Sequence, residues 1–146
     1  WFKKIRKKED VKFYLAGKNM PKFLQEQEEG KLYIKGLIES PHEYMETKSV
    51  MIVPVFSGSG IRIKILEGMS MGIPIISTSK GAKGIPYENK KNILICENSS
   101  DFYNAIKCLK DNPKLFNKIS EGGQNLIKTK FSSNIVINNW KKLINS

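Results

Sequence analysis

Short apolar runs alternate with stretches of helical period along the whole chain. Five runs, at residues 11–16, 31–35, 50–55, 73–77 and 93–96, are too short for helices and consist mainly of aliphatic and aromatic residues. We interpret them as strands, with the run at 31–35 nearest a sheet edge because it alternates most with polar residues. Strands that alternate with helices are typical of a parallel sheet covered on both faces. The pattern therefore predicts an α/β fold with an open parallel sheet.

Helical spacing predicts three helices in the first part of the chain, over residues 1–8, 23–29 and 40–45. Gly30 is expected to end the second of these helices, since glycine commonly follows the last helical residue. Ser40 and Pro41 are expected to begin the third one, because serine is a good cap and proline suits the first helical position. His42, the single histidine of the chain, then lies at a helix start, and we interpret it as an ordinary surface residue.

The C-terminal third of the chain predicts three further helices. Ser100 is expected to cap the first, and Asn112 with Pro113 to end it. A second helix follows, which the pair Gly122 and Gly123 is expected to weaken, and the last covers residues 135–144. The apolar stripe of the first of these helices consists of Phe102, Ala105, Ile106 and Leu109.

The stretch from residue 50 to 79, VMIVPVFSGSGIRIKILEGMSMGIPIISTS, predicts a strand, a glycine-rich turn, a helix from Ile61 and a second strand. The turn contains Gly58, Ser59 and Gly60, whose small side chains let the backbone approach a ligand closely. A helix start also directs N–H groups and positive partial charge at a bound anion. This turn is therefore a candidate phosphate or diphosphate site.

Arg62 and Lys64 would lie in the first helical turn, where the helix dipole disfavours cations. A bound diphosphate would reverse that penalty, so both residues are candidate stabilisers of its charge. Glu67 would lean back toward the same rim, where a carboxylate can bind sugar hydroxyls. An alternative stays open, in which both cations are solvated and Glu67 only pairs with Lys64.

Two glycines, Gly81 and Gly84, stand in the small-residue loop of residues 78–86, after the second strand of this stretch. Open parallel sheets bind ligands beyond the carboxyl ends of their strands. This loop can therefore border the same crevice, and a simple turn without ligand contact is the alternative.

The composition indicates the charge of a partner but does not identify the partner. The 146 residues include 25 Lys and Arg against 14 Asp and Glu, a net charge of +11 that favours anionic partners. The basic residues are spread along the chain without aromatic stacking motifs, so we do not expect nucleic acid binding. Cys96 and Cys108 form no metal-binding spacing, and the chain shows no transmembrane or signal-peptide pattern, which favours a cytoplasmic location.

The segment GSGIRIKILEGMSMGIPIISTSKGAKGI resembles the nucleotide-sugar-binding half of the group 1 glycosyltransferases with the GT-B fold. The similar branch has a motif of the form GGGTRxKxLEAMAxGxPVVSTxxGAEG. The resemblance implies that residues 1–146 form one Rossmann-like domain, the C-terminal half of such an enzyme without its first strand. It also implies that the backbone from Gly58 to Ile61 holds a donor diphosphate and that Glu67 binds the ribose. Leu37 and Ile38 would contact the nucleobase through backbone atoms.

The function that the resemblance implies is hexosyl transfer from a nucleotide diphosphate sugar, as in polysaccharide biosynthesis. The acceptor, a glycan or a lipid-linked sugar, would bind a domain that this chain lacks, so the chain alone would bind nucleotide without completing transfer. No cofactor and no metal are expected, since no DxD pair occurs. Ser59 replaces a glutamate found in many members of the family, and a non-catalytic nucleotide-binding or assembly module is therefore the alternative. Peripheral contact with the inner face of the plasma membrane stays open.

Overall fold

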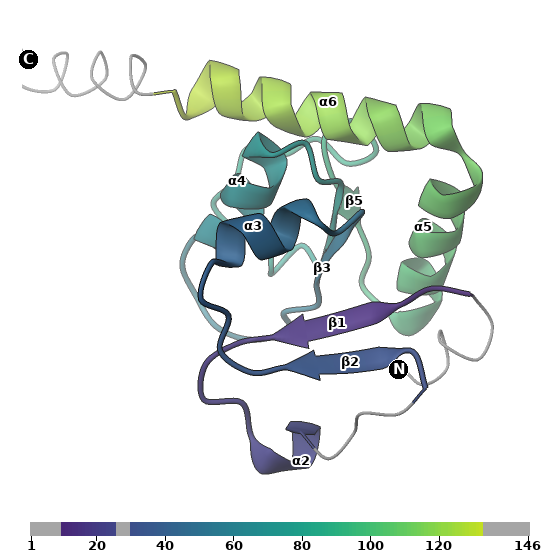
Figure 1. Ribbon diagram of the computed structural model, residues 1–146. Coiled ribbons are helices and arrows are strands. Elements are labelled where there is room, and N and C mark those ends of the chain that lie inside the picture. Colours follow the sequence, from purple (N-terminus) through teal and green to yellow (C-terminus); the bar gives the residue numbers. More distant parts are fainter. Residues whose placement is uncertain (1–9, 26–29, 133–146) are drawn as a thin grey trace, which may run out of the picture. The chain divides into compact units, whose positions relative to one another are not determined.

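The computed structural model of the protein describes residues 10–25 and 30–132 (Figure 1). The helices predicted over residues 1–8 and 135–144, and the end of the one predicted over 23–29, lie outside these ranges. The chain divides into two compact units, Trp1–Thr47 and Lys48–Ser146, which are described separately below.

The first unit is built on two parallel strands, β1 (Phe13–Ala16) and β2 (Leu32–Lys35). Their register pairs the first residue of β1 with the first of β2, and the chain continues the contact beyond the strands, where the N–H of Gly17 donates to the carbonyl of Gly36. A cross-strand aromatic pair stabilises the sheet, with the rings of Tyr14 and Tyr33 stacked at 5.1 Å. Both strands were predicted from sequence, and both are confirmed.

Two short helices complete this unit, α2 (Lys22–Gln25) and α3 (Pro41–Glu46). Pro41 occupies the first turn of α3 as predicted, but the Ser40 side chain makes no capping hydrogen bond. The ring centroids of Tyr14 and Tyr44 lie 6.4 Å apart in an edge-to-face arrangement, which packs α3 against β1.

The second unit contains a three-stranded parallel sheet in the order β3 (Met51–Val53), β4 (Ile75–Ser77), β5 (Leu94–Ile95). The helix α4 (Ile63–Ser70) joins β3 to β4, so that these elements form the predicted β-α-β unit. The strands are shorter than the apolar runs that predicted them. The parallel α/β fold is thus confirmed, with the strands that the structure describes forming one two-stranded and one three-stranded sheet.

The middle strand β4 is covered on both faces. Ile75 is fully buried in the main core cluster together with Ile65 and Met69 of α4. Successive strand residues point to opposite faces, so the equally buried Ile76 faces the other side, where α5 contacts β4. This core fixes the position of the strand ends and of the α4 start.

The helices α5 (Ser99–Asp111) and α6 (Pro113–Lys130) follow β5 and share a junction residue. The predicted apolar stripe of α5 is buried, but its cap is Asn98 rather than Ser100, because the Asn98 side chain accepts from two backbone N–H groups of the first turn. Asn112 ends α5 and caps α6, where its side chain accepts from the N–H of Leu115.

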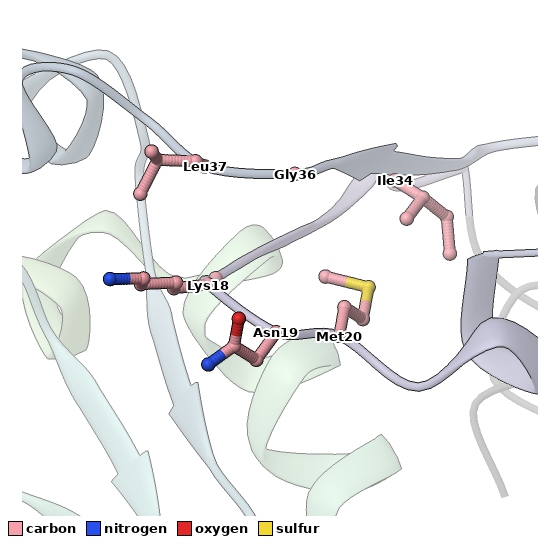
Figure 2. A pocket seen from close by; sticks show the side chains of 7 residues that line it. Lys18, Asn19, Met20, Ile34, Gly36 and Leu37 are labelled. Atoms are coloured by element: carbon pink, nitrogen blue, oxygen red, sulfur yellow. The ribbon is translucent and has the colours of Figure 1, made fainter.

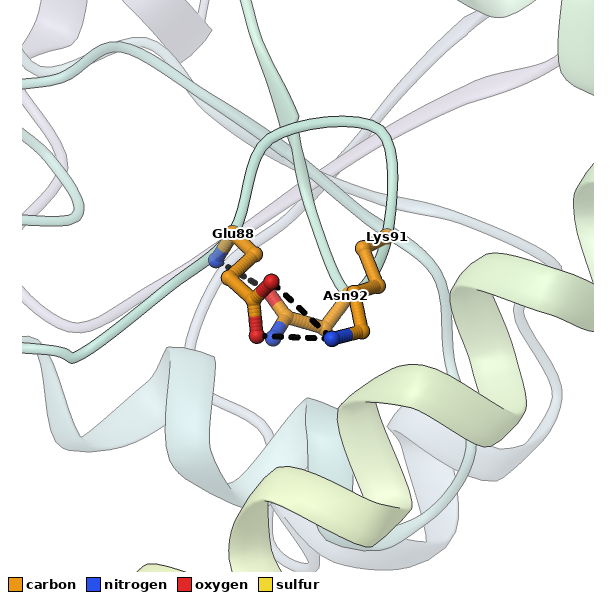
Figure 3. Close-up of polar contacts among 3 residues, drawn as sticks. All are labelled: Glu88, Lys91 and Asn92. Carbon is orange, nitrogen blue, oxygen red and sulfur yellow. Dashed lines mark hydrogen bonds and ion pairs between the residues drawn. The ribbon is translucent and has the colours of Figure 1, made fainter.

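The glycine pair does not interrupt α6, which runs without a break through Gly122 and Gly123. A Cβ atom on Gly122 would lie 2.1 Å from the carbonyl oxygen of Lys91, so the missing side chain lets helix and loop meet at backbone distance. That loop is held by Glu88, whose N–H donates to Asn92 and whose carboxylate pairs with Lys91 (Figure 3). Packing against this loop therefore accounts for a residue that propensity alone disfavours.

Candidate functional site

The glycine-rich turn between β3 and α4 is set by two left-handed backbone positions. Gly58 has φ +105° and Gly60 has φ +85°, conformations that side-chain-bearing residues rarely adopt. The helix begins at Ile63, two residues later than predicted, because Arg62 has an extended backbone and takes the cap position. Ile61 consequently lies outside the helix that was predicted to begin with it, and it is 47% exposed.

The side chain of Arg62 folds back over the turn. Its Nη1 donates to the carbonyl of Ser59 at 2.6 Å and to the carbonyl of Gly60 at 3.0 Å. A Cβ on Gly58 would lie only 2.9 Å from Nη2, so the guanidinium occupies the space that glycine leaves open. The cation therefore binds the turn itself.

Lys64 and Glu67 form an ion pair one helical turn apart, with Nζ 2.5 Å from Oε2. Both side chains remain partly exposed, at 59% and 40%. This pairing is the contact that the alternative interpretation expected. It uses a single oxygen of Glu67, and a carboxylate has capacity for further hydrogen bonds from hydroxyl groups.

The loop after β4 lies against the glycine-rich turn. The Ile61 side chain approaches Gly84, where a Cβ would lie 2.7 Å from Ile61 Cγ1. Gly84 also has φ +85°, so both its backbone conformation and this contact favour glycine. The glycine-rich turn and the loop of residues 78–86 are therefore neighbours, as expected from the sequence.

Two buried hydroxyl groups, on Ser77 and Thr78, hold these loops at the strand ends. The Ser77 hydroxyl donates to the carbonyl of Val53 at 3.2 Å, and the Thr78 hydroxyl donates to the carbonyl of Val55. Thr78 Oγ1 also accepts from the N–H of Gly81 at 2.9 Å. Neither hydroxyl was predicted from the sequence to have a role, although small polar residues at the end of an apolar run were the available signal.

The first unit contains a pocket of about 530 Å³ beyond the carboxyl ends of β1 and β2 (Figure 2). Leu37 lines it and is 72% exposed, whereas Ile38 is half-buried and is not among the lining residues. The opposite wall comes from the loop after β1 and was missed from sequence, although its glycine after an apolar run is a turn signal. The lining residues are Gly17, Lys18, Asn19, Met20, Ile34, Gly36 and Leu37.

His42 is exposed on α3, where its Nδ1 lies 3.5 Å from Glu46 Oε1. Within residues 10–25 and 30–132, no group of three or more His, Cys, Asp or Glu side chains is placed to hold a metal ion. None of the helices described in these ranges is both long and apolar enough to cross a membrane.

Comparison with known families decides the class of the chain. The model of a family described as glycosyl transferases group 1 matches residues 1–112. The chain belongs to this family. The match includes the glycine-rich turn, α4 and the loop after β4, and it covers the first unit and residues 48–112 of the second.

Solved structures show that the fold of this domain is that of GT-B glycosyltransferases. HepE from Anabaena, solved with UDP, matches 93% of this chain and 41% of its own, with a TM-score of 0.79 and 17% identity. A variant of S. aureus TarM, solved with Fondaparinux, alpha-GlcNAc-glycerol and UDP, matches 97% of this chain and 30% of its own, with a TM-score of 0.78 and 22% identity.

A third similar structure is itself a C-terminal domain, that of the group 1 family protein LpcC from Francisella tularensis. It matches 77% of this chain and 60% of its own, with a TM-score of 0.60 and 24% identity. The chain thus spans between 30% and 60% of the length of these three proteins. No match was found among curated proteins. The assignment to the C-terminal domain of a group 1 GT-B glycosyltransferase is confirmed.

Proposed function

We propose that this domain binds the nucleotide diphosphate sugar of a hexosyltransferase and that its glycine-rich turn holds the diphosphate. The observation that carries the proposal is the turn of residues 58–61 directly before α4, in a chain of the group 1 family. Two similar proteins of this fold, HepE and TarM, were solved with UDP. The single-domain organisation of residues 1–146 is part of the same proposal.

The electrostatics of the α4 start support an anionic ligand. The first turn contains no acidic residue, and Arg62 at the cap position adds positive charge where the helix dipole already disfavours cations, while the charge of Lys64 is paired with Glu67. An α-helix also leaves the N–H groups of its first turn without partners inside the helix. A diphosphate would accept from such N–H groups, and these fixed dipoles would stabilise the charge that develops as the sugar departs.

Glu67 is proposed to bind the ribose hydroxyls, which would donate to the oxygen that Lys64 does not use. In the other unit, the backbone of Leu37 and Ile38 is proposed to contact the nucleobase. Leu37 supports this role because it lines the pocket beyond β1 and β2. No cofactor or metal ion enters this proposal.

The whole enzyme is proposed to transfer the sugar to a glycan or lipid-linked acceptor, as in polysaccharide biosynthesis. Another domain would bind the acceptor, so the chain alone would bind nucleotide without turnover. A cytoplasmic location, with or without peripheral contact with the inner face of the plasma membrane, agrees with a soluble nucleotide donor. The second candidate function is a non-catalytic nucleotide-binding or assembly module. Ser59 supports it, because a glutamate commonly occupies that position in the resembled family.

Thermal unfolding with UDP, GDP and ADP tests the donor site. A nucleotide at about 100 times its Kd stabilises the folded chain by about 2.7 kcal/mol, which raises Tm by roughly 5–10 °C. We expect Glu67→Gln to lose most of this increase, while Glu121→Gln, which removes an exposed carboxylate from α6, keeps it. An unchanged Tm with every nucleotide would remove the proposal.

Turnover by the full-length protein separates the two functions. Consumption of a nucleotide sugar indicates the transferase. Nucleotide binding without any consumption, across the nucleotide sugars of each bound base, favours the non-catalytic module.

A further inference from the structure

The contact between Arg62 and the glycine-rich turn determines which way two peptide groups face. One guanidinium nitrogen, Nη1, binds the successive carbonyl oxygens of Ser59 and Gly60. Both carbonyls are therefore directed to the same side of the turn, the side on which the guanidinium lies. Their hydrogen bonds are charge-assisted, which makes them stronger than bonds between neutral groups.

The N–H groups of the same two peptides face away from Arg62. A trans peptide is planar, so its C=O and N–H point in opposite directions, and the described residues contain no cis peptide. The carbonyl of Ser59 shares its peptide with the N–H of Gly60, and the carbonyl of Gly60 shares its peptide with the N–H of Ile61. Neither N–H donates a hydrogen bond within the described parts of the chain.

We propose that Arg62 is a positioning residue of the diphosphate site, which acts through the peptides of the turn and does not touch the diphosphate. It holds the N–H groups of Gly60 and Ile61 toward the ligand, and its charge polarises both peptides so that these groups become better donors. This inference rests on the proposed function, because it takes the diphosphate as the ligand of the turn. The sequence suggested that Arg62 contacts the diphosphate directly, whereas the proposed role of Arg62 is to position the turn.

The backbone of Gly58 supports this arrangement. Its φ of +105° gives the turn its shape, and the absence of a Cβ leaves room for Nη2 of Arg62. The shape of the turn and the position of the guanidinium therefore depend on each other. Lys64, which pairs with Glu67, has no such contact with the turn.

Nuclear magnetic resonance of the full chain can test the positioning role. The sequence contains two arginines, Arg6 and Arg62, so the guanidinium region of the spectrum is simple, and Arg62→Met assigns the signal of interest. Without nucleotide, we expect Arg62→Met to shift the amide signals of Gly60 and Ile61. Lys118→Met, which removes one exposed charge from α6, is the matched control and should leave both signals in place.

Addition of UDP, with GDP and ADP as parallel probes, then separates positioning from direct contact. Positioning predicts that the Gly60 and Ile61 amide signals move on binding while the Arg62 guanidinium signal changes little. We also expect Arg62→Met to weaken binding about tenfold, which corresponds to about 1.4 kcal/mol. Lys118→Met should bind as the wild type does.

Three results would overturn the inference. These are amide signals of Gly60 and Ile61 that are the same in Arg62→Met and wild type, a guanidinium signal that moves as far as the amides, and an unchanged Kd for Arg62→Met. Failure of the proposed function would look different, since the wild-type chain would then respond to none of the three nucleotides. In that case, the amide signals of wild type and Arg62→Met without nucleotide still test the contact between Arg62 and the turn.

Discussion

Replacement of Gly122 by alanine should destabilise the protein, although helix propensity alone predicts the opposite. In the interior of a helix, Gly→Ala usually stabilises by about 1 kcal/mol. Here the new Cβ would lie 2.1 Å from the carbonyl oxygen of Lys91 and 3.0 Å from its carbonyl carbon, which is far inside van der Waals contact. Overpacking of this kind costs about 1–3 kcal/mol and sometimes more.

The obstacle is backbone, so no side-chain rotation can relieve it. Lys91 lies in a loop that is closed by hydrogen bonds from Glu88 to Asn92 and from Lys90 to Ile93, each 2.8 Å long. Either this loop or α6 must move. We expect a net loss of about 2 kcal/mol in the free energy of unfolding.

Urea unfolding and thermal scans of the full chain measure this loss, with a Tm decrease of roughly 4–8 °C. Asn117→Ala is the matched control, because Asn117 is exposed on the same helix, and alanine there should stabilise by about 0.5 kcal/mol. If Gly122→Ala is as stable as the wild type or more stable, close packing between α6 and the 88–93 loop does not explain the glycine.

Two further changes test buried groups near the strand ends. Thr78→Val should cost about 2 kcal/mol in unfolding experiments, because it leaves the carbonyl of Val55 and the N–H of Gly81 without their buried partner, and Thr78→Ser should restore most of the loss. Burial, with smaller effects of nearby carboxylates, raises the pKa of the Cys96 thiol to about 12, above its ordinary value of 9.0. Because the pKa is higher in the folded state, the contribution of the neutral thiol to the free energy of unfolding is fully present below pH 9. It is lost as the pH rises from 9 to 12. The stability advantage of wild type over Cys96→Ala should therefore shrink across that range, and thiol titration at pH 8 should label the exposed Cys108 while Cys96 reacts only on unfolding.

The elements and the family could be predicted from the sequence because their signals are local. Apolar runs marked all five described strands, and helical spacing marked the buried face of α5. The motif around the glycine-rich turn pointed to the family that the comparison confirmed. The ends of the elements were predicted less accurately, since a cap depends on which side chain accepts from the first N–H groups. In α5 these groups donate to Asn98, so Ser100 is not the cap.

The contacts of the candidate site could not be predicted from the sequence. The sequence placed Arg62 inside the first helical turn, whereas its extended backbone ends the loop and its side chain returns to Ser59 and Gly60. Charge patterns do not show whether a guanidinium faces a ligand or its own backbone. Gly122 was likewise judged by propensity, while its neighbour in space is a loop about 30 residues earlier in the chain.

The central claim is that a diphosphate binds the peptide groups of the glycine-rich turn, and a crystal structure of the chain with UDP, GDP or ADP tests it most directly. We expect diphosphate oxygens within hydrogen-bond distance of the N–H groups of Gly60 and Ile61, with Arg62 still bound to the carbonyls on the other side. A nucleotide whose diphosphate lies elsewhere on the chain, with those N–H groups facing solvent, would contradict it.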